Sequence, residues 1–239
     1  MAAPAAAHPG VRVIAHGNCV VAGGIRTQSG APVKAWDVWQ EIFVTSWPTW
    51  LGAHTHHGAE CIMNVYGVTG WWFAHGTTPD SPPSIVAVTF GKTVYTASGR
   101  VHTAGNVEAR MQGYLGIHVL EQGSDFNYPV ADPSAPPVAK SLPISVFKHE
   151  FANESPTAGT VTIENQIMEI AKGAHLRLAG SLSYYTFLGG AGTVTISGHA
   201  PQPIVAGTTY RVGRNEWIDA VLTTPAELVA TEIVPGAHP

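Results

Sequence analysis

The chain has 239 residues, only 12% of them are charged, and its formal net charge is −4. This balance gives no basic surface of the kind that nucleic-acid-binding proteins carry, so nucleic acid is not expected as a partner. No apolar run is long enough to span a bilayer, and a membrane-spanning helix is therefore not expected. The length exceeds the usual ~100–150 residues of one domain, so two small domains or one large β domain would fit.

Short runs of alternating apolar and polar residues, separated by turn formers, predict an all-β sandwich or barrel. The 26 glycines and 18 prolines agree with many turns between short strands. In the first half the expected strands are, in chain order, Val11–Ala15, Trp36–Ser46, Thr49–His57, Glu60–Gly67, Ile85–Phe90, Val94–Thr96 and Gln112–Glu121. The segment 76–83 is dense in turn formers and is expected to form a loop at the barrel mouth.

A proline-rich segment, residues 127–143, divides the chain into two near-equal parts and is typical of a semi-rigid linker. The sequence therefore predicts two domains, residues 1–137 and residues 138–239. In the second domain, the alternating runs Thr160–Ile163 and Thr193–Ile196 predict further half-buried strands.

Residues 54–60 gather side chains that bind metals. Within one β-strand, His54, His56 and Glu60 share a parity and point to the same face, whereas His57 points away. With His102 they supply three imidazoles and one carboxylate, a set that suits a divalent transition-metal ion. The residue types do not distinguish Fe, Mn, Cu, Ni and Zn. The sequence thus predicts one His3Glu metal site.

The residues around these ligands form two spaced motifs. The first reads His-x-His-x3-Glu-x6-Gly and ends at Gly67, and the second contains Gly91, Gly99, His102 and Asn106. Together they resemble the two signature motifs of the cupin family. The resemblance implies a metal ion held by His54, His56, Glu60 and His102 inside a cupin-type β-barrel, also called a double-stranded β-helix or jelly roll.

Two positions depart from the family pattern. Pro48 stands where the first motif begins with glycine, and Ala97 stands where the second motif has proline. Both are turn or backbone positions and neither is a ligand position, so the departures concern the geometry of the loops.

The second half repeats the order of turns but offers no His/His/Glu set. Aligned on Gly189, the ligand positions hold Leu176, Leu178 and Leu182; aligned on Gly190, they hold Arg177, Ala179 and Ser183. Ile218 stands where the last histidine belongs. The resemblance therefore implies a bicupin with a metal-binding N-terminal barrel and a degenerate C-terminal barrel. It also implies a homodimer, since cupins commonly dimerise.

Cupins with this ligand set include dioxygenases, oxidases, decarboxylases and isomerases. The first interpretation is a metal-dependent oxidoreductase, a dioxygenase in which a small organic substrate and O2 share the open face of the ion. Glu60 is a candidate base as well as a ligand. A non-redox isomerase, lyase or decarboxylase stays open, as does a binding protein in which the metal orients a small molecule.

Strand parity also suggests residues that line the substrate pocket. Asn64 and Tyr66 follow Glu60 with the same parity, and Tyr114 and His118 lie on the strand after the second motif. Each also has a purely structural interpretation. No Lys or Arg lies on the strands of the first motif, so an aromatic or neutral organic substrate is favoured over a small dianion such as oxalate.

Compartment and redox state are left open by the sequence. Residues 1–9 lack the basic start and apolar core of an intact signal peptide, which fits a cytoplasmic chain or a mature secreted one. The low charge content leans toward secretion. Cys19 and Cys61 permit one disulfide but do not require it, and the unpaired state is slightly favoured.

Overall fold

The computed structural model describes residues 8–27, 29–33, 35–45, 49–76, 82–106, 111–138, 144–154, 160–179 and 181–235. Pro48 and parts of the two expected loops, residues 77–81 and 139–143, lie outside these ranges. The regular elements of the described residues are β-strands, which confirms the all-β class. None of the described segments forms a helix that could cross a membrane.

The strands are, in chain order, β1 (Val11–Val21), β2 (Trp36–Thr45), β3 (Thr49–Trp50), β4 (His54–Thr55), β5 (Gly58–Tyr66), β6 (Thr69–Ala74), β7 (Ser84–Thr89), β8 (Thr93–Thr96), β9 (His102–Asn106), β10 (Gln112–Glu121), β11 (Tyr128–Pro129), β12 (Ile144–Glu154), β13 (Val161–Ile170), β14 (His175–Ala179), β15 (Ser183–Phe187), β16 (Gly192–Ile196), β17 (Gln202–Pro203), β18 (Thr209–Val212), β19 (Trp217–Leu222) and β20 (Ala226–Pro235).

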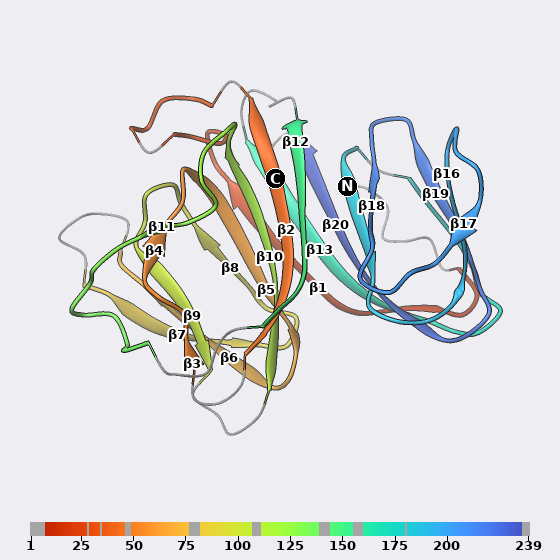
Figure 1. Cartoon of the computed structure of the whole chain (residues 1–239), viewed down its shortest axis with the longest axis horizontal. Helices are drawn as coiled ribbons and strands as arrows, with labels where there is room; N and C mark the ends of the chain where they lie inside the picture. The colour runs from red at the N-terminus through yellow and green to blue at the C-terminus, as the bar shows by residue number, and fades with distance from the viewer. Residues whose placement is uncertain are drawn as a thin grey trace. The chain divides into compact units, whose positions relative to one another are not determined.

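The chain forms two compact units, shown in Figure 1. The first unit is Cys19–Val161, and the second unit combines Met1–Asn18 with Thr162–Pro239. This division differs from the expected ranges 1–137 and 138–239 for a physical reason. Strand β12, from beyond the expected linker, pairs with β2 of the first unit, and the N-terminal strand β1 pairs with β13 in a sheet of the second unit.

The first unit is built from two sheets that face one another. One has the strand order β12-β2-β10-β5-β8, and the other has the order β11-β4-β9-β6-β7, with β3 also paired to β9. Side chains from both sheets meet in an apolar core. Its buried members are Phe43, Ile62, Trp72, Ala74, Val88, Ala104 and Tyr114. Strands β5 and β10 are buried along almost their whole length, so both of their faces are covered, one of them by the opposite sheet.

The second unit repeats this plan. Its sheets have the orders β1-β13-β20-β15-β18 and β14-β19-β16-β17. A larger apolar core fills the space between them, and it includes Leu176, Phe187, Val194 and Ile218. Leu178 packs against the edge of this core. Positions that the motif alignment matches to metal ligands therefore carry apolar packing here.

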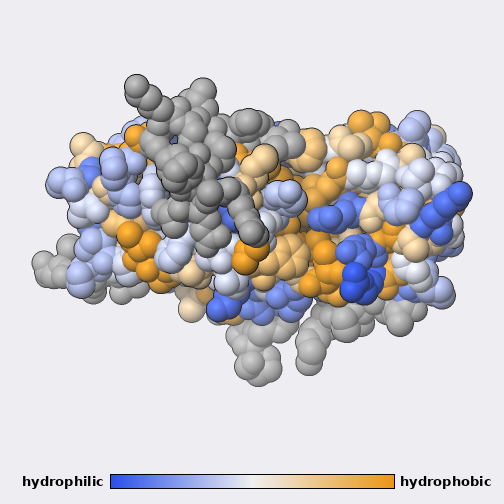
Figure 2. Space-filling view, turned by 90° about the horizontal axis from the view of Figure 1, so that it is seen from below, coloured by the Kyte–Doolittle hydropathy of each residue, from blue (hydrophilic) through white to orange (hydrophobic). Residues whose placement is uncertain are grey.

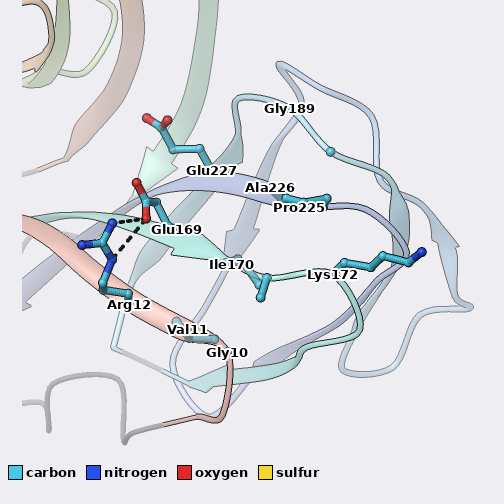
Figure 3. Close-up of a pocket in the computed structure, with 12 residues that line it drawn as sticks. Gly10, Val11, Arg12, Glu169, Ile170, Lys172, Gly189, Pro225, Ala226 and Glu227 are labelled. Atoms are coloured by element: carbon cyan, nitrogen blue, oxygen red, sulfur yellow. Dashed lines mark hydrogen bonds and ion pairs between the residues drawn. The ribbon is translucent and has the colours of Figure 1, made fainter.

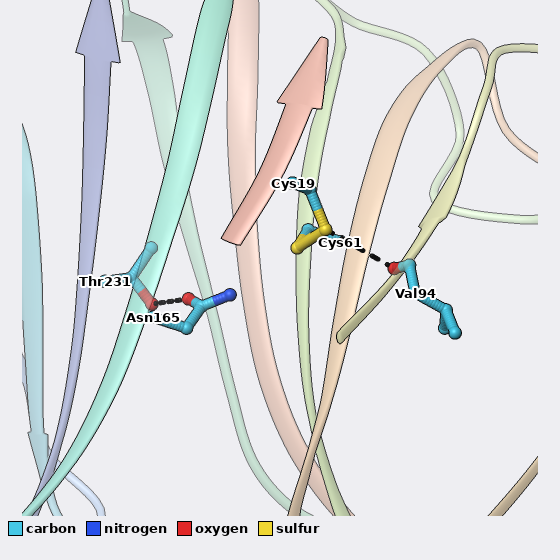
Figure 4. The surroundings of a disulfide bond; sticks show 5 residues. All are labelled: Cys19, Cys61, Val94, Asn165 and Thr231. Atoms are coloured by element: carbon cyan, nitrogen blue, oxygen red, sulfur yellow. Dashed lines mark hydrogen bonds between the residues drawn. A yellow bond between two sulfur atoms is a disulfide. The ribbon is translucent and has the colours of Figure 1, made fainter. Parts of the chain in front are cut away.

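A disulfide joins Cys19 at the end of β1 to Cys61 in the middle of β5 (Figure 4). The slight preference for unpaired cysteines was therefore wrong. A separation of 42 residues in the sequence says nothing about spatial distance, so the spacing of the two cysteines could not predict the bond. Both cysteines are buried, so the bond is shielded from reductants in solution.

Large apolar side chains also reach the surface, where Figure 2 shows apolar areas among polar ones. In the first unit the exposed ones include Tyr66, Val68, Ile85, Val86 and Phe90. Strand β7, which carries Ile85 and Val86, is the last strand of its sheet. An apolar edge strand without charged residues is open to pairing with another chain.

Candidate metal centre

Both sheets of the first unit contribute to the candidate site. His54 in β4 lies directly opposite His102 in β9, and Glu60 in β5 lies directly opposite His118 in β10. The sequence had suggested a strand through His57, but β4 ends at Thr55 and β5 begins at Gly58. The chain passes from one sheet to the other between these strands, so the ligands converge from two facing sheets and not from one strand face.

The glycine at this crossing is required. Gly58 has a φ of 156°, and a β-carbon there would lie 2.2 Å from the carbonyl oxygen of Val119. No other residue could begin β5 this close to β10. This close approach fixes the position along β10 at which Glu60 points into the space between the sheets.

Five side chains form two overlapping groups that share His56. One group is His54, His56 and His102, and the other is His56, Glu60 and His118; within each group the ligand atoms lie within 4.8 Å of one another. Glu60 Oε2 lies 3.0 Å from His102 Nε2 and 3.8 Å from His56 Nε2. Glu60 Oε1 lies 3.5 Å from His118 Nε2. All five side chains are buried.

Backbone carbonyl groups orient three of the imidazoles. The Nδ1 atoms of His54, His56 and His102 donate to the carbonyl oxygens of Gly52, Phe126 and Arg100, at 2.7, 2.6 and 2.7 Å. In a neutral ring with the proton on Nδ1, Nε2 carries a lone pair and has no hydrogen to give. The Nε2 atoms are therefore left as free acceptors that face the cluster, the arrangement that metal-binding histidines require.

These inward atoms lack partners among the described residues. His56 Nε2, His102 Nε2, Glu60 Oε2 and both ring nitrogens of His118 are buried and make no hydrogen bond. His102 Nε2 and Glu60 Oε2 are only 3.0 Å apart, and both are acceptors when Glu60 is ionised. Each unsatisfied buried polar group costs about 1–3 kcal/mol. A cation between these atoms would remove that cost, so the residues fit a transition-metal ion.

Burial also sets the protonation states. Loss of hydration lowers the pKa values of His54, His56 and His102 to about 4, and it lowers the pKa of His118 well below its usual value. The same burial raises the pKa of Glu60. At neutral pH the imidazoles are therefore uncharged, and no proton has to leave them before a metal binds.

A cavity of about 20 Å³ lies beside the cluster, which is room for about one water molecule. Its walls are Glu41, Phe43, Leu51, His54, Glu60, Ile62, Trp72, Ala104, His118, Phe126 and Asn127. Most of these side chains are apolar, and none of the described lining residues is Lys or Arg. The segment that carries Phe126 is anchored at both ends, by the His56–Phe126 hydrogen bond and by His75 Nε2, which lies 2.7 Å from Asp132 Oδ2.

Of the four suggested pocket residues, only His118 lines the cavity. Asn64 donates from Nδ2 to the carbonyl oxygen of Val88, and Tyr66 is exposed. The Tyr114 hydroxyl donates to the carbonyl oxygen of Gly105. These three side chains are directed to other parts of the sheets. His57 stacks on Tyr128 with ring centroids 4.0 Å apart, outside the cluster as its parity indicated.

Glu41 in β2 was not singled out from the sequence, because no motif surrounds it. Its carboxylate lines the cavity, with Oε1 3.9 Å from His118 Nε2. Burial raises the pKa of Glu41 from 4.5 to about 7, with Lys148 lowering it and Glu60 raising it. The register of β2 against β10 brings Glu41 opposite Gly116, close to the site.

This shift predicts a pH effect on the metal-free protein. The folded state keeps a proton on Glu41 that the unfolded state releases, so stability falls as pH rises from about 4.5 to about 7. Over this range we expect the unfolding free energy of the wild type to fall by roughly 3 kcal/mol, and we expect Glu41→Gln to abolish this fall. Urea denaturation of both proteins at several pH values between 5 and 8 measures it. Parallel stability curves for the two proteins would contradict the shift.

A larger hollow lies elsewhere, in the second unit (Figure 3). It measures about 700 Å³ and is lined by residues 10–12, 169–172, 189–190 and 225–227. Arg12 and Glu169 form an ion pair in its wall, and Lys172 extends along the opposite side. No group of metal-binding side chains converges there among the described residues. The candidate metal centre thus belongs to the first unit.

Comparison with solved structures identifies the fold. No protein-family model and no curated protein matches this sequence. Solved structures do match. A mutant oxalate decarboxylase of Bacillus subtilis has a TM-score of 0.59 and 14% identity, covering 92% of this chain and 76% of its own. AerE from Microcystis aeruginosa has a TM-score of 0.55 and 12% identity, covering 83% and 88%.

A third match is the 7S globulin of Momordica charantia, with a TM-score of 0.54 and 9% identity over 84% of this chain and 74% of that one. All three are cupin-fold proteins. The chain therefore has the cupin fold, in two β-barrels of the jelly-roll type, which confirms the fold that the two motifs implied.

Proposed function

We propose that this protein is a metal-dependent cupin oxidoreductase, a dioxygenase that acts on a small, uncharged or aromatic organic molecule. The observation that carries the proposal is the buried set of ligand atoms that face one another without hydrogen bonds. His54, His56, Glu60 and His102 would hold one divalent transition-metal ion. Such an ion, when bound, supplies Lewis-acid or one-electron chemistry at its open positions.

The chain's own residues have defined tasks in this reaction. Phe43, Trp72 and Phe126 exclude water from the cavity, which strengthens the electrostatic interactions inside it. Glu60, whose pKa is raised by burial, would accept a proton from the substrate at Oε1. An organic substrate larger than the present cavity would enter by displacing the segment that carries Phe126.

The cavity wall supports an uncharged substrate. A dianion such as oxalate would be buried without a positive side chain among the described lining residues, and burying an unpaired charge is costly. Apolar and aromatic walls instead suit a neutral or aromatic ring. The structural likeness to oxalate decarboxylase supports a metal-dependent cupin enzyme. The apolar lining of the cavity, however, favours a substrate other than oxalate.

Oxygen consumption tests the proposal. We expect the protein reconstituted with Fe, Mn, Cu or Ni to consume O2 in step with the loss of an aromatic or neutral substrate. Turnover should stop under argon and return when air is readmitted. Protein loaded with Zn, which has no redox chemistry, is the matched control. Equal turnover with and without oxygen would refute the dioxygenase reaction.

A non-redox decarboxylase is the second candidate, and Glu41 is the observation in its favour. A carboxyl group whose pKa is raised to about 7 beside the cavity could donate a proton to a carbanion left by loss of CO2. In that case CO2 release from a carboxylic acid substrate would continue under argon, and Glu41→Gln would stop it. The two candidates therefore separate in the same oxygen experiment.

We also propose that the protein is exported and forms a homodimer. The buried Cys19–Cys61 disulfide supports export, since disulfides persist in oxidising compartments. The exposed apolar residues of the edge strand β7 support a homodimer, because self-association would cover them.

A further inference from the structure

His118 is an enclosed imidazole that the four-ligand site does not explain. It lies in β10 with 2% of its surface exposed, directly opposite Glu60. Neither ring nitrogen makes a hydrogen bond, whereas the other three histidines of the cluster each donate to a backbone carbonyl. A buried histidine kept for structure alone would normally have at least one partner. His118 therefore requires a partner that hydrogen bonding within the protein does not supply.

The ring is directed into the cluster. Its Nε2 lies 3.5 Å from Glu60 Oε1 and 3.9 Å from Glu41 Oε1, and its centroid lies 4.7 Å from that of His56. Phe126 packs edge-on against it at 4.5 Å and closes the other side. The ligand atoms of His118, His56 and Glu60 lie within 4.8 Å of one another, as do those of His54, His56 and His102. His118 thus has two of the four proposed ligands, His56 and Glu60, as near neighbours.

The neighbouring backbone makes room for this orientation. Gly116 precedes His118 on the same face of β10, and a β-carbon at Gly116 would lie only 2.9 Å from His118 Nε2. Any larger residue at this position would push the ring away from Glu60. The glycine therefore keeps open the space that the inward-facing ring occupies.

We propose that His118 is a fifth protein ligand of the same ion, so that the centre is of the His4Glu type. This rests on the metal site proposed above and not on the reaction it performs. A six-coordinate ion with five protein ligands keeps one open position. The cavity of about 20 Å³ beside the cluster has room for one molecule the size of water or O2. The organic substrate then binds beside the ion, and only a single small molecule binds to it.

Copper(II) binding to the metal-free protein tests the fifth ligand without any assay of activity. Two variants remove the imidazole: His118→Gln keeps a polar side chain, and His118→Phe fills the space with an apolar ring. His57→Gln is the matched control, because His57 lies next to the cluster in sequence but stacks on Tyr128. We expect at least tenfold weaker binding in both His118 variants. Their electron paramagnetic resonance spectra should show one coordinated nitrogen fewer, while the control keeps both properties.

Wild-type affinity and an unchanged spectrum in the His118 variants would overturn the proposal and leave the four-ligand site intact. Failure of the wild-type protein to bind copper would overturn the metal site itself, so the two failures are distinct. If both variants misfold, X-ray absorption of the metal-loaded wild-type protein decides the question. Scattering from four imidazoles supports the fifth ligand, and scattering from three overturns it.

Discussion

Replacing His56 by alanine is expected to abolish metal binding, with at least a 100-fold loss of affinity on the order-of-magnitude scale set by ligand-shell substitutions. His56 is the residue shared by the two groups of ligand atoms, so its removal breaks both. Its Nδ1 also holds the carbonyl oxygen of Phe126, and the segment that closes the cavity would be released as well. Elemental mass spectrometry of protein purified without added metal or chelator measures the metal content.

Graded results are expected for the other histidines. His102→Ala and His54→Ala break only one of the two groups, so each should lower metal occupancy less than His56→Ala does. His57→Ala is the control, because its ring lies outside the cluster and stacks on Tyr128. Full metal occupancy in His56→Ala would exclude the proposed ligand set, whatever the activity of the protein.

Removal of the disulfide is expected to cause the largest change in stability. The Cys19→Ala/Cys61→Ala double substitution opens a loop closed over 42 residues of sequence separation. The chain-entropy estimate for a loop of this length is about 4 kcal/mol of unfolding free energy. Urea denaturation of the double variant against the oxidised wild type measures this difference. The sulfurs are buried, so mild reductant added to the folded protein should leave the wild type unchanged.

The double substitution also shows whether the disulfide stabilises the fold alone or supports the metal site as well. Cys61 directly follows Glu60, yet it faces Cys19 on the opposite side of β5. Metal content in the folded double variant should therefore stay close to that of the wild type. Coinciding denaturation curves for the two proteins would show that the bond adds no stability, contrary to this expectation.

The metal motif was the part of the site that local sequence could identify. His54, His56 and Glu60 lie within seven consecutive positions, and His102 has its own surrounding glycines, so their spacing carries the information. The way in which these side chains converge could not be predicted from local spacing. Parity suggested a single strand face, whereas the chain changes sheets between β4 and β5.

The remaining site residues depend on pairing between distant strands. His118 reaches the cluster because it is in register with Glu60 across β10 and β5, and Glu41 because β2 pairs with the other edge of β10. No spacing within one segment encodes such a register. The pocket residues Asn64, Tyr66 and Tyr114 were suggested by parity alone, and hydrogen bonds or exposure direct them elsewhere.

The pairing of β1 with β13 bears on how the protein is made. Residues of β1 leave the ribosome well before those of β13, which pairs with them and lies about 140 residues farther along the chain. Until then β1 has no sheet to join, and β2 likewise lacks β12 on one side. Closing such distant contacts slows folding and leaves strand edges open meanwhile. The nascent chain therefore carries these unpaired strand edges until β12 and β13 have been synthesised.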